Sequence, residues 1–175
     1  RLTDVTGVQT CALPICTADR SPDATLRRDG PVTVWLETRI RVRYADTDQM
    51  GIVYNGKYLE YFEVGRTELI RACGLSYREF EASGTRLPLV EAHCRYHQPA
   101  EYDDVLAVRA EVREFPRSTL RIAYEIRRES DGIMITTGYT THAFLDVATL
   151  RPVRPPASFL DAMWPGHRAS VTPTP

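Results

Sequence analysis

The stretch NGKYLEYFEVGRTELIRACGL, residues 55–75, carries the pattern that decides the fold. Apolar or small side chains recur three or four residues apart along it, which is the spacing of one face of an α-helix. Gly74 follows the last of them, in the position where helices often end. The spacing therefore predicts a helix over about 55–73. Its apolar stripe consists of Tyr58, Phe62, Gly65, Leu69 and Ala72, widened by Leu59 and Ile70.

Gly65 lies in the middle of this helix, where glycine costs about 1 kcal/mol relative to alanine. We expect a compensation from packing, because a residue without a side chain lets the helix approach a sheet closely. A second, short helix is expected at Tyr77–Ala82.

The rest of the chain favours β-strands. At 39–44, three arginines alternate with Ile40, Val42 and Tyr44, which is the period of a half-buried strand. SDG at 130–132 is a tight hairpin signal, and PAEYDD at 99–104 predicts a turn. These patterns predict an α+β fold, with an antiparallel sheet of at least five strands whose apolar face packs on the long helix. The later strands are expected at 90–97, 106–113, 120–127 and 133–146.

The bulk composition is that of an ordinary globular domain. The chain has 175 residues, 43% of them hydrophobic and 26% charged, with a net charge of −1. A charge so close to zero gives no indication of a nucleic-acid partner. No apolar run reaches the ~18 residues that a membrane span needs.

The two ends of the chain differ from its middle. Residues 1–34 show no sustained period, and we interpret them as a disordered or artefactual segment. Residues 164–175 are expected to form a disordered tail. The folded domain is therefore expected at 35–163.

The four cysteines show no metal-binding pattern. They lack metal-ligand spacing, which favours reduced thiols in a cytoplasmic protein. A Cys94 nucleophile paired with His93 or His97 is the alternative, although strand alternation sends neighbouring side chains to opposite faces. The chain also lacks nucleotide-binding and serine-hydrolase motifs, so no metal or cofactor is expected. The four cysteines are Cys11, Cys16, Cys73 and Cys94.

Two acids, Asp46 and Asp48, separate the first strand from the helix. Short acids in loops are most often turn or cap residues. A carboxylate can also act as nucleophile or general base toward an acyl carbon, if a helix start supplies backbone N–H groups to stabilise the oxyanion. Gly51 and a helix that begins near residue 55 provide that layout. The spacing alone leaves both interpretations open.

YADTDQMGIVYNGKYLEYFEVGRTELIR at 44–71, followed by PLVEAHCRYHQPAEYDDVL at 88–106, resembles the hotdog-fold acyl-CoA thioesterases, specifically the hydroxybenzoyl-CoA thioesterase and YbgC-like group. The resemblance covers about 37–156. It implies a sheet wrapped around a long central helix, two subunits that join their sheets, and active sites at the dimer interface. It also implies hydrolysis of acyl-CoA thioesters without metal or cofactor, in a homodimer or a dimer of dimers.

The resemblance assigns roles to individual residues. Asp48 matches the catalytic carboxylate, and Asp46 is expected to hold the turn. Asn55 matches the position whose backbone N–H polarises the thioester carbonyl, and Gly51 shapes the loop. The candidates for substrate binding are Tyr54, Tyr58, Glu63 and Arg117, with an ion pair to Arg66 as the alternative role of Glu63 and a solvated surface position as that of Arg117.

The sequence departs from the family pattern at Asn55, where many YbgC-like members have histidine. Asparagine hydrogen-bonds but does not transfer protons at neutral pH. The alternative function is therefore an acyl-CoA or acyl-carrier-protein binding module with little or no turnover. A hotdog dehydratase fits less well, because its motif needs a histidine on the central helix and this helix has none.

Overall fold

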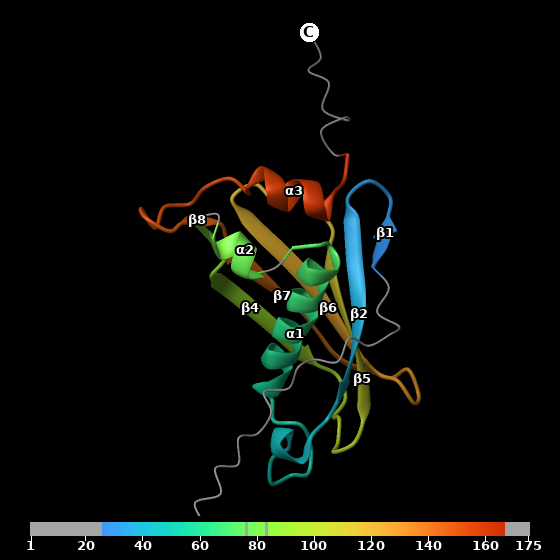
Figure 1. Cartoon of the computed structure of the whole chain (residues 1–175). Coiled ribbons are helices and arrows are strands. Elements are labelled where there is room, and N and C mark those ends of the chain that lie inside the picture. Colours follow the sequence, from blue (N-terminus) through green and yellow to red (C-terminus); the bar gives the residue numbers. More distant parts are fainter. Residues whose placement is uncertain (1–25, 76, 83, 167–175) are drawn as a thin grey trace, which may run out of the picture.

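A computed structural model describes residues 26–75, 77–82 and 84–166. Its main element is a six-stranded sheet with the order β1-β2-β5-β6-β7-β4 (Figure 1). Every neighbouring pair is antiparallel. The strands are β1 (Arg27–Asp29), β2 (Thr33–Arg41), β4 (Leu89–Tyr96), β5 (Val105–Val112), β6 (Thr119–Arg128) and β7 (Met134–Ala143).

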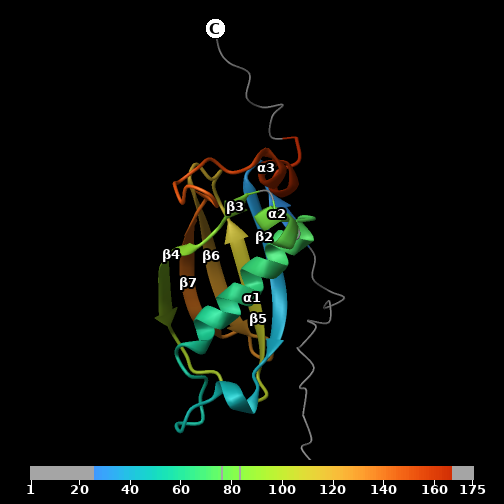
Figure 2. The same cartoon turned by 60° about the vertical axis from the view of Figure 1, so that its left-hand side comes forward.

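One long helix, α1 (Lys57–Ala72), crosses one face of this sheet diagonally (Figure 2). The arrangement confirms the predicted hotdog fold, an antiparallel sheet around a central helix. No helix in the described ranges is long and apolar enough to cross a membrane. The smaller elements are η1 (Tyr44–Asp46), α2 (Tyr77–Ala82), β3 (Thr85–Arg86), β8 (Leu145–Asp146) and α3 (Ala157–Met163).

Helix α1 lies close to the sheet because two glycines leave room for it. Phe62 stacks on Tyr124 of β6, with ring centroids 4.3 Å apart. A Cβ atom on Gly65 would lie 3.0 Å from Cγ1 of Val108, as the expected close approach requires. On the sheet side, a Cβ on Gly138 would lie 2.7 Å from the Phe62 ring. Glycine at both positions thus lets the helix approach the sheet closely enough for Phe62 to stack on Tyr124.

The first long strand is longer than the sequence pattern indicated. β2 begins at Thr33, whereas alternation is plain only from residue 39. Trp35 breaks the pattern, because this large apolar side chain lies on the outer face of the sheet. The Arg109 guanidinium covers it, 3.9 Å from the ring centroid. At the other end, Tyr44 belongs to η1 and is 79% exposed, so its predicted inward direction was wrong.

β4 is far more exposed than its alternation suggested. It forms an edge of the sheet, and Val90 and Tyr96 remain 59% and 51% exposed. An edge strand has a neighbour on one side only, and α1 packs mainly against β2 and β5, on the other side of the sheet. The expected strand at 133–146 is also divided, because Leu145 and Asp146 leave the main sheet and pair with β3.

Ordered structure extends beyond the expected domain limits of 35 and 163. β1 and the start of β2 precede residue 35. Trp164 is buried beside Phe115, with ring centroids 5.0 Å apart, and its indole N–H donates to the Val32 carbonyl. Both segments, β1 with the start of β2 and the residues around Trp164, thus belong to the folded domain. Residues 1–25 and 167–175 lie outside the described residues, so the expected disorder there stays a prediction.

A buried polar chain lies between α1 and the sheet. His142 is 1% exposed and contacts the Thr140 hydroxyl (3.0 Å) and the Leu87 carbonyl (3.3 Å) through its two ring nitrogens. The Tyr124 hydroxyl lies 2.8 Å from the same Thr140 oxygen. Burial and the nearby Arg66 cation lower the pKa of His142 to about 4. The imidazole is therefore buried in its neutral form.

This histidine should make stability fall in mild acid. Because its folded pKa is about 4 and its ordinary value 6.5, only the unfolded chain takes up a proton between these pH values. Stability is expected to be flat above pH 6.5 and to fall by as much as roughly 3 kcal/mol toward pH 4. Urea unfolding across this range measures it. His142→Gln, which does not titrate, should flatten the dependence, and an unchanged slope would contradict the assignment.

Candidate active site

The two acids of the sequence motif lie on a small hairpin between β2 and α1. At its base, the Tyr54 amide donates to the Asp46 carbonyl (2.9 Å), and at its tip the Asp48 amide donates to the Ile52 carbonyl (2.9 Å). Gly51 closes the tip, with its amide donating to the Asp48 carbonyl at 2.9 Å. Its φ of +77° is in the left-handed region that favours glycine.

The loop between β4 and β5 supports this hairpin from one side. The Val53 amide donates to the Ala100 carbonyl (2.8 Å), and Ile52 forms a bridge with Glu101. Asp48 is consequently held on a hydrogen-bonded turn rather than on a free loop.

The Asp48 side chain is partly exposed and lightly bonded. Its Oδ1 accepts a hydrogen bond from the Met50 amide at 2.8 Å. Within the described ranges its Oδ2 has no hydrogen-bond partner, so one carboxylate oxygen is available to a ligand. This is the state that a nucleophile or a general base needs.

A cavity of about 500 Å³ brings Asp48 and the start of α1 together. Tyr54, Asn55 and Tyr58 line it from the turn and the first residues of the helix. No side chain caps the N-terminus of α1, whose N-cap residue is Gly56. The Lys57 amide already donates to the Tyr54 carbonyl at 2.9 Å, so a developing oxyanion would bind to those amides of this turn that lack such a partner, helped by the partial positive charge of the helix start. The remaining wall consists of Met50, Ile52, Val53, Tyr96, His97, Gln98 and Pro99.

Two of the predicted substrate-binding residues lie away from this cavity. Glu63 binds Arg66 through two contacts, Nε to Oε2 at 2.6 Å and Nη2 to Oε1 at 2.5 Å, so the alternative ion pair is formed. Arg117 is exposed on the loop after β5. The register places that loop at the far end of the sheet, because Arg41, next to the hairpin, pairs with Val105 at the opposite end of β5. Neither residue lines the cavity that Asp48 borders.

The alternative cysteine nucleophile finds no support. Cys94 packs against the core, whereas His93 stacks on Tyr139 of the outer face, with ring centroids 5.3 Å apart. Burial raises the pKa of the Cys94 thiol, which disfavours the reactive thiolate. The described residues also contain no group of three or more histidine, cysteine, aspartate or glutamate side chains that could hold a metal ion.

Tyr96 is a site residue that the sequence pattern missed. Its hydroxyl donates to the Asn55 carbonyl at 3.1 Å, and its ring lies 5.5 Å from that of Tyr58. Partial burial and the adjacent Cys94 raise its pKa to about 12, so the phenol keeps its proton. Tyr96 lies within the strand expected at 90–97, but nothing in the sequence showed that this strand ends beside the helix start.

Removing this hydroxyl should loosen the turn before α1. Tyr96→Phe keeps the ring contacts and loses one hydrogen bond, which is worth about 1 kcal/mol. We expect a reaction that depends on this site to lose about 5-fold in kcat/KM. Steady-state kinetics measure this, and a variant as active as the wild type would show that the bond does not matter to the site.

Comparison with known proteins places the chain in a family. Residues 42–163, more than half of the chain, match the family model of the thioesterase-like superfamily. The chain belongs to this superfamily. It is 33% identical to a putative acyl-CoA thioesterase, YneP, of Bacillus subtilis, over 70% of this chain and 88% of that protein. It is 31% identical to the acyl-CoA thioesterase YbgC of Haemophilus influenzae, over 65% and 83%.

A solved structure agrees with these sequence relatives. The DHNA-CoA thioesterase of Staphylococcus aureus superposes with a TM-score of 0.66 at 32% identity, over 77% of this chain and 87% of that one. The predicted family and the predicted enzyme class, a hotdog-fold thioesterase related to YbgC, are confirmed.

Proposed function

We propose that the protein hydrolyses an acyl-CoA thioester to the free acid and CoA, with Asp48 as the catalytic carboxylate. The observation that carries this proposal is the shared cavity, which borders both Asp48 and the uncapped start of α1. A thioester carbonyl bound there would have a carboxylate near its carbon and backbone N–H groups near its oxygen. The relatives named as acyl-CoA thioesterases support the choice of substrate.

Asp48 has two possible modes of action. As a nucleophile, its oxygen bonds to the carbonyl carbon, the C–S bond breaks, and CoA leaves as a thiolate that takes a proton. Water then hydrolyses the mixed anhydride. As a general base, Asp48 removes a proton from a water molecule while that water attacks the same carbon; the C–S bond then breaks, and the CoA thiolate that leaves takes a proton. In both modes, negative charge develops on the carbonyl oxygen, where the Asn55 backbone and the first turn of α1 would stabilise it.

The cavity favours an acyl group with apolar surface. Its wall combines aliphatic side chains with the rings of Tyr54, Tyr58 and Tyr96. Its volume of about 500 Å³ lies in the range of small-molecule sites. We therefore propose that the acyl part binds against these rings.

A second copy of the chain is the proposed partner, in a homodimer or a dimer of dimers. β4 is an edge strand with exposed apolar side chains, including Leu89 and Val90, which are 54% and 59% exposed. Such an edge pairs readily with another strand. The cavity wall runs into the end of this strand through Tyr96 and His97, so a copy paired along β4 would border the open side of the site.

Asn55 favours the second candidate, a module that binds acyl-CoA or an acyl carrier protein with little turnover. Its side chain has no hydrogen-bond partner among the described residues, and an amide cannot supply a proton.

One assay separates the two functions. Wild-type protein is mixed with short-chain, medium-chain and aromatic acyl-CoAs and with acyl-carrier-protein thioesters, and free thiol is measured. The proposal expects turnover of at least one acyl-CoA. Calorimetric binding of acyl-CoA without thiol release would favour the module, and turnover confined to carrier-protein thioesters would change the substrate class.

A further inference from the structure

We propose that Asp46 is a positioning residue that fixes Asp48 relative to the start of α1. This inference rests on the proposed function, because it concerns the same site. Asp46 does not line the cavity and is 1% exposed. It therefore has no path to the substrate and must act through the residues that it holds.

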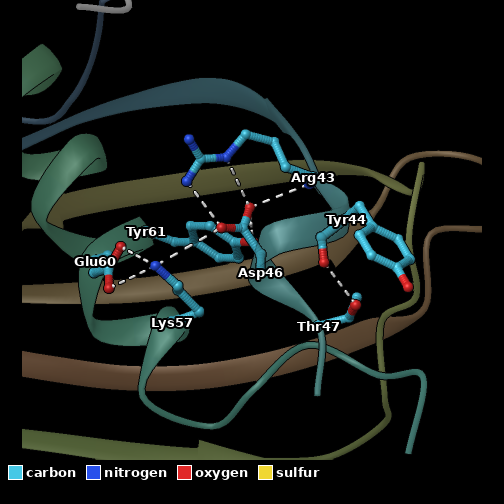
Figure 3. Close-up of polar contacts among 7 residues, drawn as sticks. All are labelled: Arg43, Tyr44, Asp46, Thr47, Lys57, Glu60 and Tyr61. Atoms are coloured by element: carbon cyan, nitrogen blue, oxygen red, sulfur yellow. Dashed lines mark hydrogen bonds and ion pairs between the residues drawn. The ribbon is translucent and has the colours of Figure 1, made fainter. Parts of the chain in front are cut away.

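The Asp46 carboxylate is bound from two sides, by the residue that follows β2 and by helix α1 (Figure 3). Arg43, which follows β2, donates from its backbone amide and its Nε to Oδ2 (3.1 and 3.2 Å) and from Nη2 to Oδ1 (2.9 Å). From α1, the Tyr61 hydroxyl donates to Oδ2 at 3.2 Å, and Lys57 Nζ lies 3.8 Å from Oδ1. We call these four residues the Asp46 clamp.

The charge on Asp46 is essential to the clamp. Burial raises the pKa of this carboxyl, but the hydrogen bonds and positive charge of Arg43, together with the Tyr61 hydroxyl, offset burial and leave the pKa below its ordinary value. An ionised carboxylate this deeply buried needs such partners, because an unpaired buried charge is very costly. The side chains of the Asp46 clamp therefore have few alternative conformations, and we expect the clamp to be rigid.

The backbone of Asp46 connects the Asp46 clamp to the hairpin that carries Asp48. Its carbonyl accepts the Tyr54 amide at the hairpin base, and the next rung is the bridge between Thr47 and Val53. Asp48 follows one residue later. The side chain of Asp46 thus holds helix α1, while its main chain holds the hairpin that presents Asp48.

The Asp46 clamp fixes the position of Asp48 relative to the start of α1, and the proposed catalysis depends on that position. A carboxylate and an oxyanion donor act together only when both are in place, and a displacement of about 1 Å can cost about 100-fold in rate. Loosening the clamp should therefore lower kcat more than it raises KM, because the cavity wall itself remains.

The test compares Asp46→Asn with a matched control, Asp146→Asn. Asp146 also closes a turn, since its Oδ1 accepts the Thr149 amide and hydroxyl, both at 2.8 Å, and the Ala148 amide at 3.1 Å. It lies on β8, remote from the hairpin (Figure 1). Asparagine at residue 46 removes the charge and turns an amide N–H₂ toward the arginine.

We expect Asp46→Asn to lower kcat about 30-fold while KM changes by less than about 3-fold. Asp146→Asn should lose stability with kcat unchanged. Tyr61→Phe, which removes one donor and keeps the ring, should show a smaller fall in kcat of the same kind, and it keeps the proposal testable if Asp46→Asn does not fold. Wild-type kcat in both clamp variants, or an equal loss in Asp146→Asn, would overturn the proposal.

A second readout does not depend on activity. Hydrogen exchange of the Tyr54 amide should speed up in Asp46→Asn and stay unchanged in Asp146→Asn, because only the first loosens the hairpin base. Faster exchange in a protein whose wild type hydrolyses no thioester would refute the proposed function and leave the clamp intact. Unchanged exchange would refute the clamp, whatever the activity.

Discussion

Replacing Asp48 by asparagine is expected to lower kcat for thioester hydrolysis about 1,000-fold, equivalent to about 4 kcal/mol in the barrier. The amide is neither a nucleophile nor a base, yet it has nearly the same shape. Its oxygen can still accept the Met50 amide, so the turn should survive. We therefore expect little change in KM and in stability. Free-thiol release from the best acyl-CoA of the panel measures the loss.

A matched control is available at Asp131. Its Oδ1 accepts the amide of Ile133 at 3.0 Å, two residues on, as Asp48 does with Met50. Asp131 lies in the turn between β6 and β7 and does not line the cavity. Asp131→Asn should leave kcat unchanged. If Asp48→Asn is as active as this control, the carboxylate is not catalytic.

Replacing Gly138 by alanine is expected to destabilise the fold by more than about 3 kcal/mol. A Cβ atom at this position would lie 2.2 Å from the His93 carbonyl oxygen, which belongs to the backbone of β4 and cannot move alone. It would also press on the Phe62 ring, which stacks on Tyr124. Either the edge strand or the helix must shift. Chemical denaturation followed by circular dichroism measures the free energy of unfolding.

Gly65→Ala tests the same helix–sheet contact from the other side. There the nearest atom, Cγ1 of Val108 at 3.0 Å, is at the end of a side chain, and alanine favours a helix interior by about 1 kcal/mol. The two effects oppose each other, so we expect a net change within about 1 kcal/mol. Equal losses for the two variants would show that backbone contact at Gly138 is not the limiting feature.

Much of the fold follows from local periodicity. The stripe that contains Phe62 and Leu69 determines which face of α1 is buried, and both residues are fully buried. Periodicity fails where a neighbour in space changes the environment. Trp35 is an apolar residue at an outward position, where Arg109 covers its ring, and Val90 stays exposed because β4 is an edge.

The candidate site was accessible from sequence only in part. Asp48, Asn55 and Tyr58 are close along the chain, and they border one cavity. Tyr96 joins them from β4, about 40 residues away, and only the sheet order brings it there. Glu63 does not line this cavity and forms an ion pair with Arg66, so its predicted role in substrate binding stays a prediction. Local spacing therefore predicted the residues between β2 and α1, whereas the part of the cavity wall that β4 contributes depends on tertiary structure.

In the proposed function, a thioester carbonyl is held between Asp48 and the start of α1. A crystal structure of Asp48→Asn with a bound acyl-CoA would show whether it is. We predict the carbonyl carbon about 3–3.5 Å from the residue 48 side chain. The carbonyl oxygen should lie about 2.7–3.1 Å from a backbone N–H at the helix start. A thioester bound elsewhere, or one whose oxygen points away from α1, would contradict the account.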